Sequence, residues 1–336
     1  MLSKLLVRPW AWWLNKVPLS VTLVLLLLDG GPLSMSAAAS MVLVVLSVCA
    51  VGNYGYALND LYDIEEDTRT GRPNAALALG RGRTGWIVAG SAVAALALGW
   101  LAAGAWGAAL TLGVLMLPLA YSVPPLRIKE RGWMGVAADA LAAHVFPAAL
   151  AVLTVTHLGP AQPSTLAIGC ILAWSAAAGL RGILSHQLKT ADRDVQGGLR
   201  TVVHALGRPT VERFVLFVLL PVEAAGFIGA VVASDTGPVL WAFGTLYLAC
   251  EIYRTANPRF RVRALRPEGQ RYLPLVEECF YKAWGPFVIA FDAARIDLKF
   301  LVVPLLYALM FRMHLKNEAG KLKAIGESLA AAPKAG

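Results

Sequence analysis

The sequence contains few charged residues. Only 15% of its 336 residues are charged, 57% are hydrophobic, and the mean hydropathy is +0.61. A soluble domain of this length would carry about 25% charged residues, so the composition excludes an ordinary water-soluble protein. Apolar runs long enough to cross a bilayer recur along the chain, and they do not alternate as strands of a membrane barrel do. We therefore expect an all-α, polytopic transmembrane bundle of about nine or ten helices around a central cavity.

Cysteine and histidine are also scarce. The four cysteines are scattered through apolar segments, no C-x-x-C pair occurs, and no histidine lies at ligand spacing from a cysteine. This pattern disfavours a zinc site and a disulfide framework. The cysteines are better interpreted as small buried hydrophobic residues.

Acidic residues number 21 against 30 basic ones, and the net charge is +9. The basic residues lie in alternate loops between apolar runs, whereas the opposite connections, near Gly30, Gly104, Gly159 and Asp235, carry none. This asymmetry predicts the orientation of a membrane protein and excludes nucleic acid as a partner. We expect an integral protein of a bacterial-type inner membrane, with the N-terminus, the long loops and the active site on the cytoplasmic side.

The apolar runs give the expected spans and domain organisation. The spans cover about Val17–Asp29, Ser36–Leu58, Gly85–Ala103, Trp106–Tyr121, Gly135–Thr156, Ser164–Leu184, Val211–Ala233, Pro238–Tyr253, Leu273–Phe291 and Phe300–Phe311. Tryptophans near residue 12 mark the first span as a transmembrane helix with an interfacial belt rather than a cleaved signal. Residues 1–315 are expected to form one domain, and residues 316–336 a polar C-terminal tail.

A first polar stripe lies where the second apolar run ends. Asn59, Asp63 and Asp67 are spaced i, i+4 and i+8, so they share one face of a helix. Carboxylates at this spacing repel one another unless a cation neutralises them, and oxygen ligands suit Mg²⁺ bound to a diphosphate. Arg72, beside a glycine and a proline, is a candidate diphosphate clamp. The alternative is a solvated acidic helix end.

A second stripe follows the sixth span, with His186, Thr190 and Asp194 at the same spacing. Asp192 would point elsewhere on a regular helix and can join the site only if the helix loosens near the glycines beyond it. Alone, this segment is equally typical of an ordinary charged loop. Paired with the first stripe, it predicts a second arm for metal and phosphate.

Several segments together resemble the UbiA superfamily of intramembrane prenyltransferases. They are Asn59-Asp60-Leu61-Tyr62-Asp63 with Asp67 and Arg72-Pro73; Tyr121-Ser122-Val123-Pro124-Pro125-Leu126-Arg127-Ile128-Lys129; and Asp194 with Gly198-Leu199-Arg200-Thr201. The resemblance extends over roughly Asn15 to Phe311. In the family's second motif, an aspartate usually precedes the final one by four residues, and this chain has Thr190 there.

The resemblance implies a mechanism that the residues also support. Mg²⁺ bridges an isoprenoid diphosphate to metal ligands, here Asn59, Asp63, Asp67 and Asp194, with Asp192 as a substitute. The catalytic residues would be Asp63, Asp67, Asp194 and His186, the last as a base that accepts a proton from the acceptor. The diphosphate would be bound by Arg72, Lys129, Arg200, Arg181 and Tyr121. The allylic cation would lie among aromatic rings, for which Tyr56, Tyr62, Tyr121 and Phe146 are candidates.

Other polar residues fall inside the spans, where such residues usually face the bundle interior and mark function. They are Asp139, His144, Arg181, Glu223 and Glu251. Asp139 and His144 are candidates for contact with an acceptor. Hydrogen bonds between helices explain them equally well.

The leading interpretation is a Mg²⁺-dependent enzyme that ionises an isoprenoid diphosphate and transfers the prenyl group to a small-molecule or lipid acceptor. The first alternative is a membrane terpene cyclase, which uses the same ionisation without an acceptor. A transporter that couples ions through the acidic stripe is the third. It is disfavoured because the acidic groups lie at helix ends rather than in broken spans.

Overall fold

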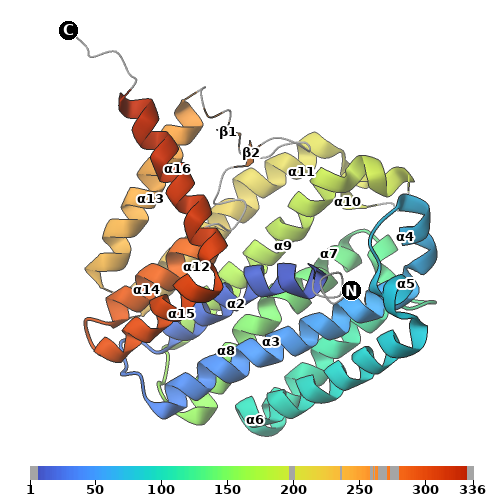
Figure 1. Cartoon of the computed structure of the whole chain (residues 1–336), viewed down its shortest axis with the longest axis horizontal. Coiled ribbons are helices and arrows are strands. Elements are labelled where there is room, and N and C mark those ends of the chain that lie inside the picture. Colours follow the sequence, from blue (N-terminus) through green and yellow to red (C-terminus); the bar gives the residue numbers. More distant parts are fainter. Residues whose placement is uncertain are drawn as a thin grey trace.

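A computed structural model describes residues 7–196, 201–234, 237–257, 260, 262–263, 271–272 and 280–330. The chain forms a bundle of helices (Figure 1). In order these are α2 (Val7–Leu27), α3 (Met35–Tyr62), α4 (Ile64–Thr70), α5 (Ala75–Leu79), α6 (Arg81–Ser122), η1 (Ile128–Glu130), α7 (Trp133–Ala140), η2 (Leu141–Val145), α8 (Phe146–Leu158), α9 (Thr165–Gln196), α10 (Val202–Leu206), α11 (Arg208–Phe214), η3 (Val215–Leu219), α12 (Leu220–Ala233), α13 (Pro238–Ala256), η5 (Phe280–Trp284), α14 (Gly285–Ala293), η6 (Leu298–Leu301), α15 (Val302–Met310) and α16 (Arg312–Ala330). The strands β1 (Val262–Arg263) and β2 (Arg271–Tyr272) have two residues each and pair in parallel. The all-α prediction is confirmed.

The long helix α6 is a hairpin of two legs. Its backbone leaves helical geometry at Ala103 and at Gly104, where φ is +58°, a value that glycine adopts without strain. Gly99 and Gly107 then meet across the turn, and a Cβ atom on Gly107 would overlap the Gly99 carbonyl oxygen. The two legs correspond to the spans predicted at Gly85–Ala103 and Trp106–Tyr121.

Among the residues that the structure describes, five segments are long and apolar enough to cross a membrane: Met35–Tyr62, Arg81–Ser122, Trp133–Leu158, Thr165–Asp192 and Arg208–Ala233. A sixth results if the pair Leu298–Met310 and Arg312–Ala330, bent by 85°, is one span. Since Arg81–Ser122 folds back on itself and further helices are short, the predicted nine or ten crossings stay a prediction.

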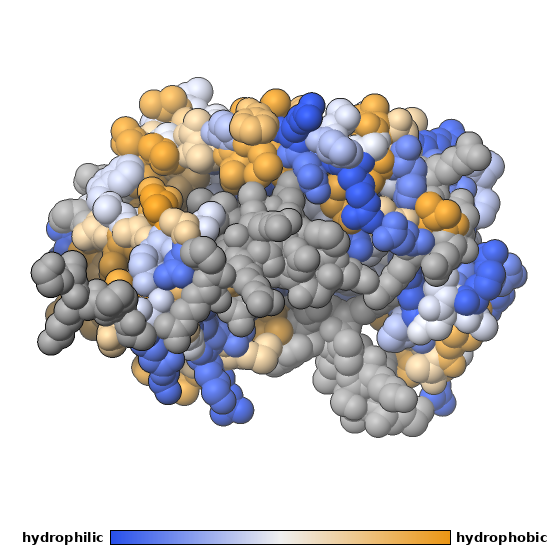
Figure 2. Space-filling view, turned by 90° about the horizontal axis from the view of Figure 1, so that it is seen from above, coloured by the Kyte–Doolittle hydropathy of each residue, from blue (hydrophilic) through white to orange (hydrophobic). Residues whose placement is uncertain are grey.

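The outer surface is suited to lipid. Trp86, Trp106 and Phe217 each expose more than 70% of their surface, which would be unfavourable in water for so many large apolar side chains. The face shown in Figure 2 carries hydrophobic patches interspersed with hydrophilic side chains. The chain is therefore an integral membrane protein.

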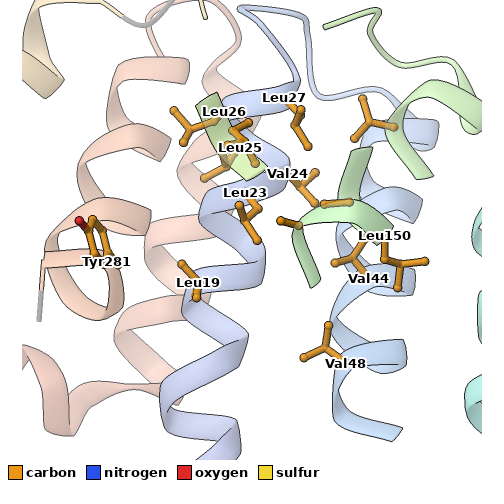
Figure 3. Packing of buried hydrophobic residues seen from close by; sticks show 14 of the residues in the cluster. Leu19, Leu23, Val24, Leu25, Leu26, Leu27, Val44, Val48, Leu150 and Tyr281 are labelled. Atoms are coloured by element: carbon orange, nitrogen blue, oxygen red, sulfur yellow. The ribbon is translucent and has the colours of Figure 1, made fainter. Parts of the chain in front are cut away.

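The core surrounds α2. Leu23, Val24 and Leu27 are buried and face Val44 and Val48 of α3 and Leu150 of α8 (Figure 3). Because lipid is as apolar as these side chains, close packing holds the helices together, and small residues allow the closest approaches. Gly226 of α12 is an example: a Cβ there would lie 2.7 Å from the Trp174 backbone nitrogen of α9.

The C-terminal segment forms a packed helix. α16 begins at Arg312 and runs without a break across residue 316, the predicted start of a polar tail. Its Ser328 hydroxyl lies 3.0 Å from the Tyr253 hydroxyl of α13, and its Glu318 accepts a hydrogen bond from the Trp284 indole. This helix therefore belongs to the bundle as far as Ala330.

Candidate active site

A cavity of about 1050 Å³ lies within the bundle. Its polar and aromatic lining comes from α2, α3, α4, α6, η1, α7, η2, α9, α16 and the short segments beside them. These lining residues are Asn15, Lys16, Tyr56, Asn59, Asp63, Glu66, Arg72, Tyr121, Ser122, Lys129, Asp139, His144, Ser185, His186, Gln187, Lys189, Asp194, Thr201, His314, Asn317, Glu318 and Lys321. Most of the residues predicted for the site therefore meet in one cavity.

The first polar stripe lies at a break between two helices. α3 ends at Tyr62 and α4 begins at Ile64, so Asp63 lies at the junction, with φ −102° and ψ 12°. Asn59 and Asp63 line the cavity, as predicted, and Glu66 lines it too. We call Asn59, Asp63 and Glu66 the first arm.

Asp67 has a different environment from the one predicted. Its side chain is buried but is not part of the cavity lining, and its Oδ2 accepts a hydrogen bond of 2.8 Å from Asn74. The same amide donates to the Asp60 carbonyl oxygen (2.8 Å), and the Asn74 Oδ1 caps α5 by accepting from the Ala76 N–H. The break at Asp63 places Glu66 where a continuous helix would have placed Asp67. In this structure Asp67 supports the loop that carries Arg72.

Two cations of the loop after α6 face the first arm. The Lys129 ammonium lies 2.5 Å from Asp63 Oδ1 and 3.1 Å from Glu66 Oε2. Arg127 reaches the same two carboxylates at 3.4 and 3.1 Å. Arg127 adopts a left-handed backbone (φ +34°), which costs about 1 kcal/mol for a residue with a side chain. The turn directs both cations to the acidic helix end.

Arg72 connects the two halves of the site. Its guanidinium lies 3.5 Å from Glu66 Oε1 and 3.4 Å from Asp194 Oδ1. One side chain therefore spans the distance between the first helical region and α9. This contact brings together the two acidic segments, which are more than 120 residues apart in the sequence.

The second arm consists of Asp194 and Thr190 on α9. The Thr190 hydroxyl donates a hydrogen bond of 2.7 Å to Asp194 Oδ2. The residue that differs from the family's usual aspartate thus orients the remaining carboxylate. His186, one turn earlier on the same face, also lines the cavity.

Asp192 does not join this arm. α9 stays helical to Gln196, so Asp192 points away, with its side chain 91% exposed and 3.0 Å from Arg208. The loosening of the helix that would have brought Asp192 to a metal does not occur. The expectation that it substitutes as a ligand is corrected on this ground.

Arg181 also lies apart from the cavity. It is fully buried and forms an ion pair with Glu223 of α12, including an Nη2–Oε1 hydrogen bond of 2.9 Å. An unpaired charge between two membrane helices would be costly, which explains this partner. The structure therefore gives Arg181 a role in joining α9 to α12, in place of the predicted contact with diphosphate.

The other predicted residues are divided between the cavity and its surroundings. Tyr56 and Tyr121 line the cavity, whereas Phe146 is buried in the hydrophobic core and Tyr62 is 43% exposed. Arg200 lies outside the described residues. Of the polar residues inside the spans, Asp139 and His144 line the cavity, and Glu251 pairs with Arg254 at 2.8 Å.

Comparison with known proteins shows the family of this chain. The sequence pattern of the UbiA prenyltransferase family matches residues 17–264, more than half of the chain. The chain belongs to the UbiA prenyltransferase family. No curated protein sequence matches it.

Solved structures share the fold of this UbiA-family chain. A UbiA homologue from Archaeoglobus fulgidus bound to DMAPP and Mg²⁺ has a TM-score of 0.56 at 17% identity, covering 89% of this chain and 97% of that one. The same homologue bound to GPP and Mg²⁺ also scores 0.56, at 16% identity over 89% and 98%. An apo homologue from Aeropyrum pernix K1 has a TM-score of 0.57 at 18% identity, over 84% and 97%.

The donor set of this UbiA-family site fits a hard cation. Asp63, Glu66 and Asp194 offer carboxylate oxygens and Asn59 an amide oxygen, and oxygen atoms are the ligands that Mg²⁺ prefers. Within the part of the chain that the structure describes, no three acidic, histidine or cysteine side chains already form a metal cluster. The reason is visible in the ion pairs, since Lys129, Arg127 and Arg72 lie between the carboxylates.

The cavity residues Glu66 and Lys16, and Arg127, which contacts the carboxylates of the first arm, were missing from the predicted site. Glu66 is spaced i+3 from Asp63, and only the helix break makes that spacing the relevant one. Arg127 was noticed as a loop charge, and its turn could not be derived from the sequence. Lys16 was interpreted as part of the entrance to the first span, although a lysine within an apolar run is itself a signal of function.

Proposed function

We propose that this protein is a Mg²⁺-dependent intramembrane prenyltransferase, which ionises an isoprenoid diphosphate and transfers the prenyl group to an acceptor. The observation that carries the proposal is the meeting of both acidic arms in one cavity, joined by Arg72. The UbiA homologue from Archaeoglobus fulgidus, whose fold this chain shares, binds DMAPP or GPP with Mg²⁺.

The ion pairs of the site suggest how a diphosphate is received. Asp63, Glu66 and Asp194 carry three negative charges, and Lys129, Arg127 and Arg72 carry three positive ones. When the substrate enters, the cations exchange carboxylate oxygens for phosphate oxygens, and the arginines can bind these in a bidentate manner. The freed carboxylates, with Asn59, would hold Mg²⁺, which neutralises the charge that develops on the departing diphosphate.

The aromatic and basic side chains of the cavity lining suit the carbocation that forms when diphosphate leaves. The bond between C1 and the bridging oxygen breaks, its electron pair leaves with diphosphate, and positive charge remains on the allyl group. The rings of Tyr56 and Tyr121 can stabilise this charge through their faces. His186, which lines the cavity two turns before Asp194 on α9, can accept a proton as the acceptor reacts.

Transfer is favoured over cyclisation by the polarity of the cavity. A cyclase must shield its cation from nucleophiles, which calls for an apolar, aromatic lining. Here Lys16, Asp139 and His144 line the same space, and Tyr56 and Tyr121 are the aromatic residues of the described lining. Groups that can bind and deprotonate an acceptor are therefore already in place.

The proposed location is the cytoplasmic side of an inner membrane. Arg72 and Lys129 are close in the sequence to Arg81 and Arg83, at the start of α6, and to Arg131, while the turn at Gly104 between the two legs of α6 carries no basic residue. Positively charged loops remain on the cytoplasmic side. A protease-accessibility assay in inverted and right-side-out vesicles would test this orientation.

The function is tested with purified protein in lipid, geranyl diphosphate and Mg²⁺, with and without a mixture of lipid-soluble cell extract. We expect diphosphate release and a prenylated product only with the extract. Formation of a cyclic hydrocarbon without extract would show that the protein is a cyclase and not a transferase. Absence of diphosphate release in both tubes would refute both enzymes.

A further inference from the structure

The C-terminal helix α16 carries a row of positive charges on its outer side. Arg312, Lys316 and Lys323 are exposed and are spaced i, i+4 and i+11, so they share one face of the helix. We call these three residues the basic stripe. Lys323 lies 3.9 Å from Glu327, but both side chains are more than 60% exposed, and an ion pair so open to solvent is weak.

The opposite side of α16 is packed against the protein. His314 Nε2 lies 2.8 Å from the Leu14 carbonyl oxygen of α2, and Glu318 accepts a hydrogen bond from the Trp284 indole. Ile325, two turns beyond Glu318, is buried. The basic stripe is on the face opposite these contacts, so it points away from the bundle.

The helix α16 lies across the membrane spans rather than along them. It is bent by 85° from the preceding segment Leu298–Met310, and in Figure 1 it runs across the direction of α3. Six of its 19 residues are acidic or basic, which would be costly within hydrocarbon. A polar helix with this direction fits the membrane interface, where amphipathic helices lie flat.

The far end of α16 indicates which interface this is. The Ser328 hydroxyl lies 3.0 Å from the Tyr253 hydroxyl in the last turn of α13. Arg254 follows directly, and the sequence has five further arginines between residues 255 and 271. Positively charged connections remain on the cytoplasmic side. The proposed orientation therefore places this end of α16 at the cytoplasmic leaflet, which carries the anionic lipids.

The side chains beside the basic stripe also suit lipid. Leu322 and Leu329 are 42% and 56% exposed and lie to one side of the stripe. A helix of this kind can place its leucines in the acyl layer while the long basic side chains extend to the headgroups. A free anion in water would gain nothing from the leucines, so the combination favours a lipid surface.

We propose that the basic stripe of α16 binds the headgroups of anionic phospholipid at the cytoplasmic membrane surface. The three cations contact the phosphate groups, and the two leucines enter the adjacent acyl layer. The proposal does not depend on the reaction proposed above. Because Asn317 and Lys321 of the same helix line the cavity, lipid bound on the outer face would also hold one wall of the cavity in place.

The test uses the full-length protein purified in a neutral detergent. It is titrated with dioctanoyl phosphatidylglycerol, and the thermal unfolding midpoint is recorded, because a ligand of the folded state raises it. We expect saturable stabilisation that dioctanoyl phosphatidylcholine and inorganic phosphate do not reproduce. The triple variant Arg312→Gln, Lys316→Gln, Lys323→Gln should weaken the apparent affinity about 100-fold, since each cation removed costs about fivefold.

A matched control removes the same charge from another basic region. Arg69, Arg81 and Arg83 are also exposed, and their triple replacement by glutamine should leave the affinity at the wild-type level. Equal losses in both triple variants would show attraction by net charge alone and would overturn the stripe as a site. An unchanged affinity in the α16 variant would overturn it too, and so would equal stabilisation by inorganic phosphate.

A single substitution keeps the test decisive if the triple variant of α16 does not fold. Lys316→Gln changes one exposed side chain and should weaken the apparent affinity about fivefold. A change of less than twofold in this folded variant would contradict the proposal. Diphosphate release is not measured in any of these titrations, so their result is independent of the transferase function.

Discussion

The two acidic arms have the same spacing in the sequence and different structures. In the first arm the helix breaks at Asp63, and Asn59, Asp63 and Glu66 face the cavity. In the second arm, α9 continues unbroken to Gln196, and Asp194 is the carboxylate that faces inward.

Helix geometry therefore decides which carboxylates of each acidic segment face the cavity. A break shifts the useful spacing from i+4 to i+3 and turns Asp67 toward Asn74. An intact helix keeps Asp192 outside, although it lies only two residues from Asp194. We therefore expect the two arms to respond to mutation unequally.

Asp63→Asn should have the largest effect. Asp63 meets both Lys129 and Arg127, and loss of its charge removes the centre of the first arm. We expect diphosphate release from geranyl diphosphate to fall by about 1000-fold, the scale of a lost electrostatic contact in an active site. The folded state should survive, as checked by thermal unfolding. Activity within a factor of two of wild type would remove Asp63 from the mechanism.

Asp194→Asn tests the second arm, with Asp192→Asn as its matched control on the same helix. Because Asp194 is buried and contacts Arg72, we expect a loss of about 100-fold in diphosphate release. Asp192 is exposed, so its variant should retain full activity. If Asp192→Asn lost more activity than Asp194→Asn, the helix α9 would have to unwind near Asp192 during catalysis.

Thr190→Val should have a smaller effect on the same arm. The valine keeps the shape and removes the hydroxyl that orients Asp194. We expect the Mg²⁺ concentration for half-maximal activity to rise about tenfold, as for other residues that support metal ligands. Thr190→Ser retains the hydroxyl and should titrate like wild type. An unchanged Mg²⁺ titration in the valine variant would contradict the supporting role.

Asn74→Ala should act mainly on stability. It removes the cap of α5 and the amide bonds to Asp60 and Asp67, which we expect to lower the free energy of unfolding by about 1 to 2 kcal/mol. Asn74→Asp keeps the cap and loses the amide donor, so it separates the two contributions. If both variants unfold like wild type, the loop does not depend on Asn74.

Much of the fold could be predicted from the sequence. Apolar runs and charged loops gave the helical class and the location of the hairpin near Gly104, because each depends on local composition. The course of the C-terminal segment could not be predicted. Ser328 and Glu318 of α16 contact Tyr253 and Trp284, and such contacts between distant helices leave no local pattern.

The site was predictable where a regular helix persists. Asn59, Asp63, His186 and Asp194 line the cavity as expected, because their spacing and their helices agree. Glu66 was missed because one junction residue changes the register of the acidic segment. The partner of Arg181 could not be known, because Glu223 lies 42 positions away on another helix.

The guanidinium that joins the two arms also bears on how a catalytic cycle ends. Arg72 has carboxylate partners within the protein, so in the proposed reaction pyrophosphate would compete with Glu66 and Asp194 for this side chain. When Glu66 and Asp194 bind Arg72 again, pyrophosphate would dissociate faster. Competition from these two carboxylates would reduce product inhibition, and it would also weaken binding of the incoming diphosphate.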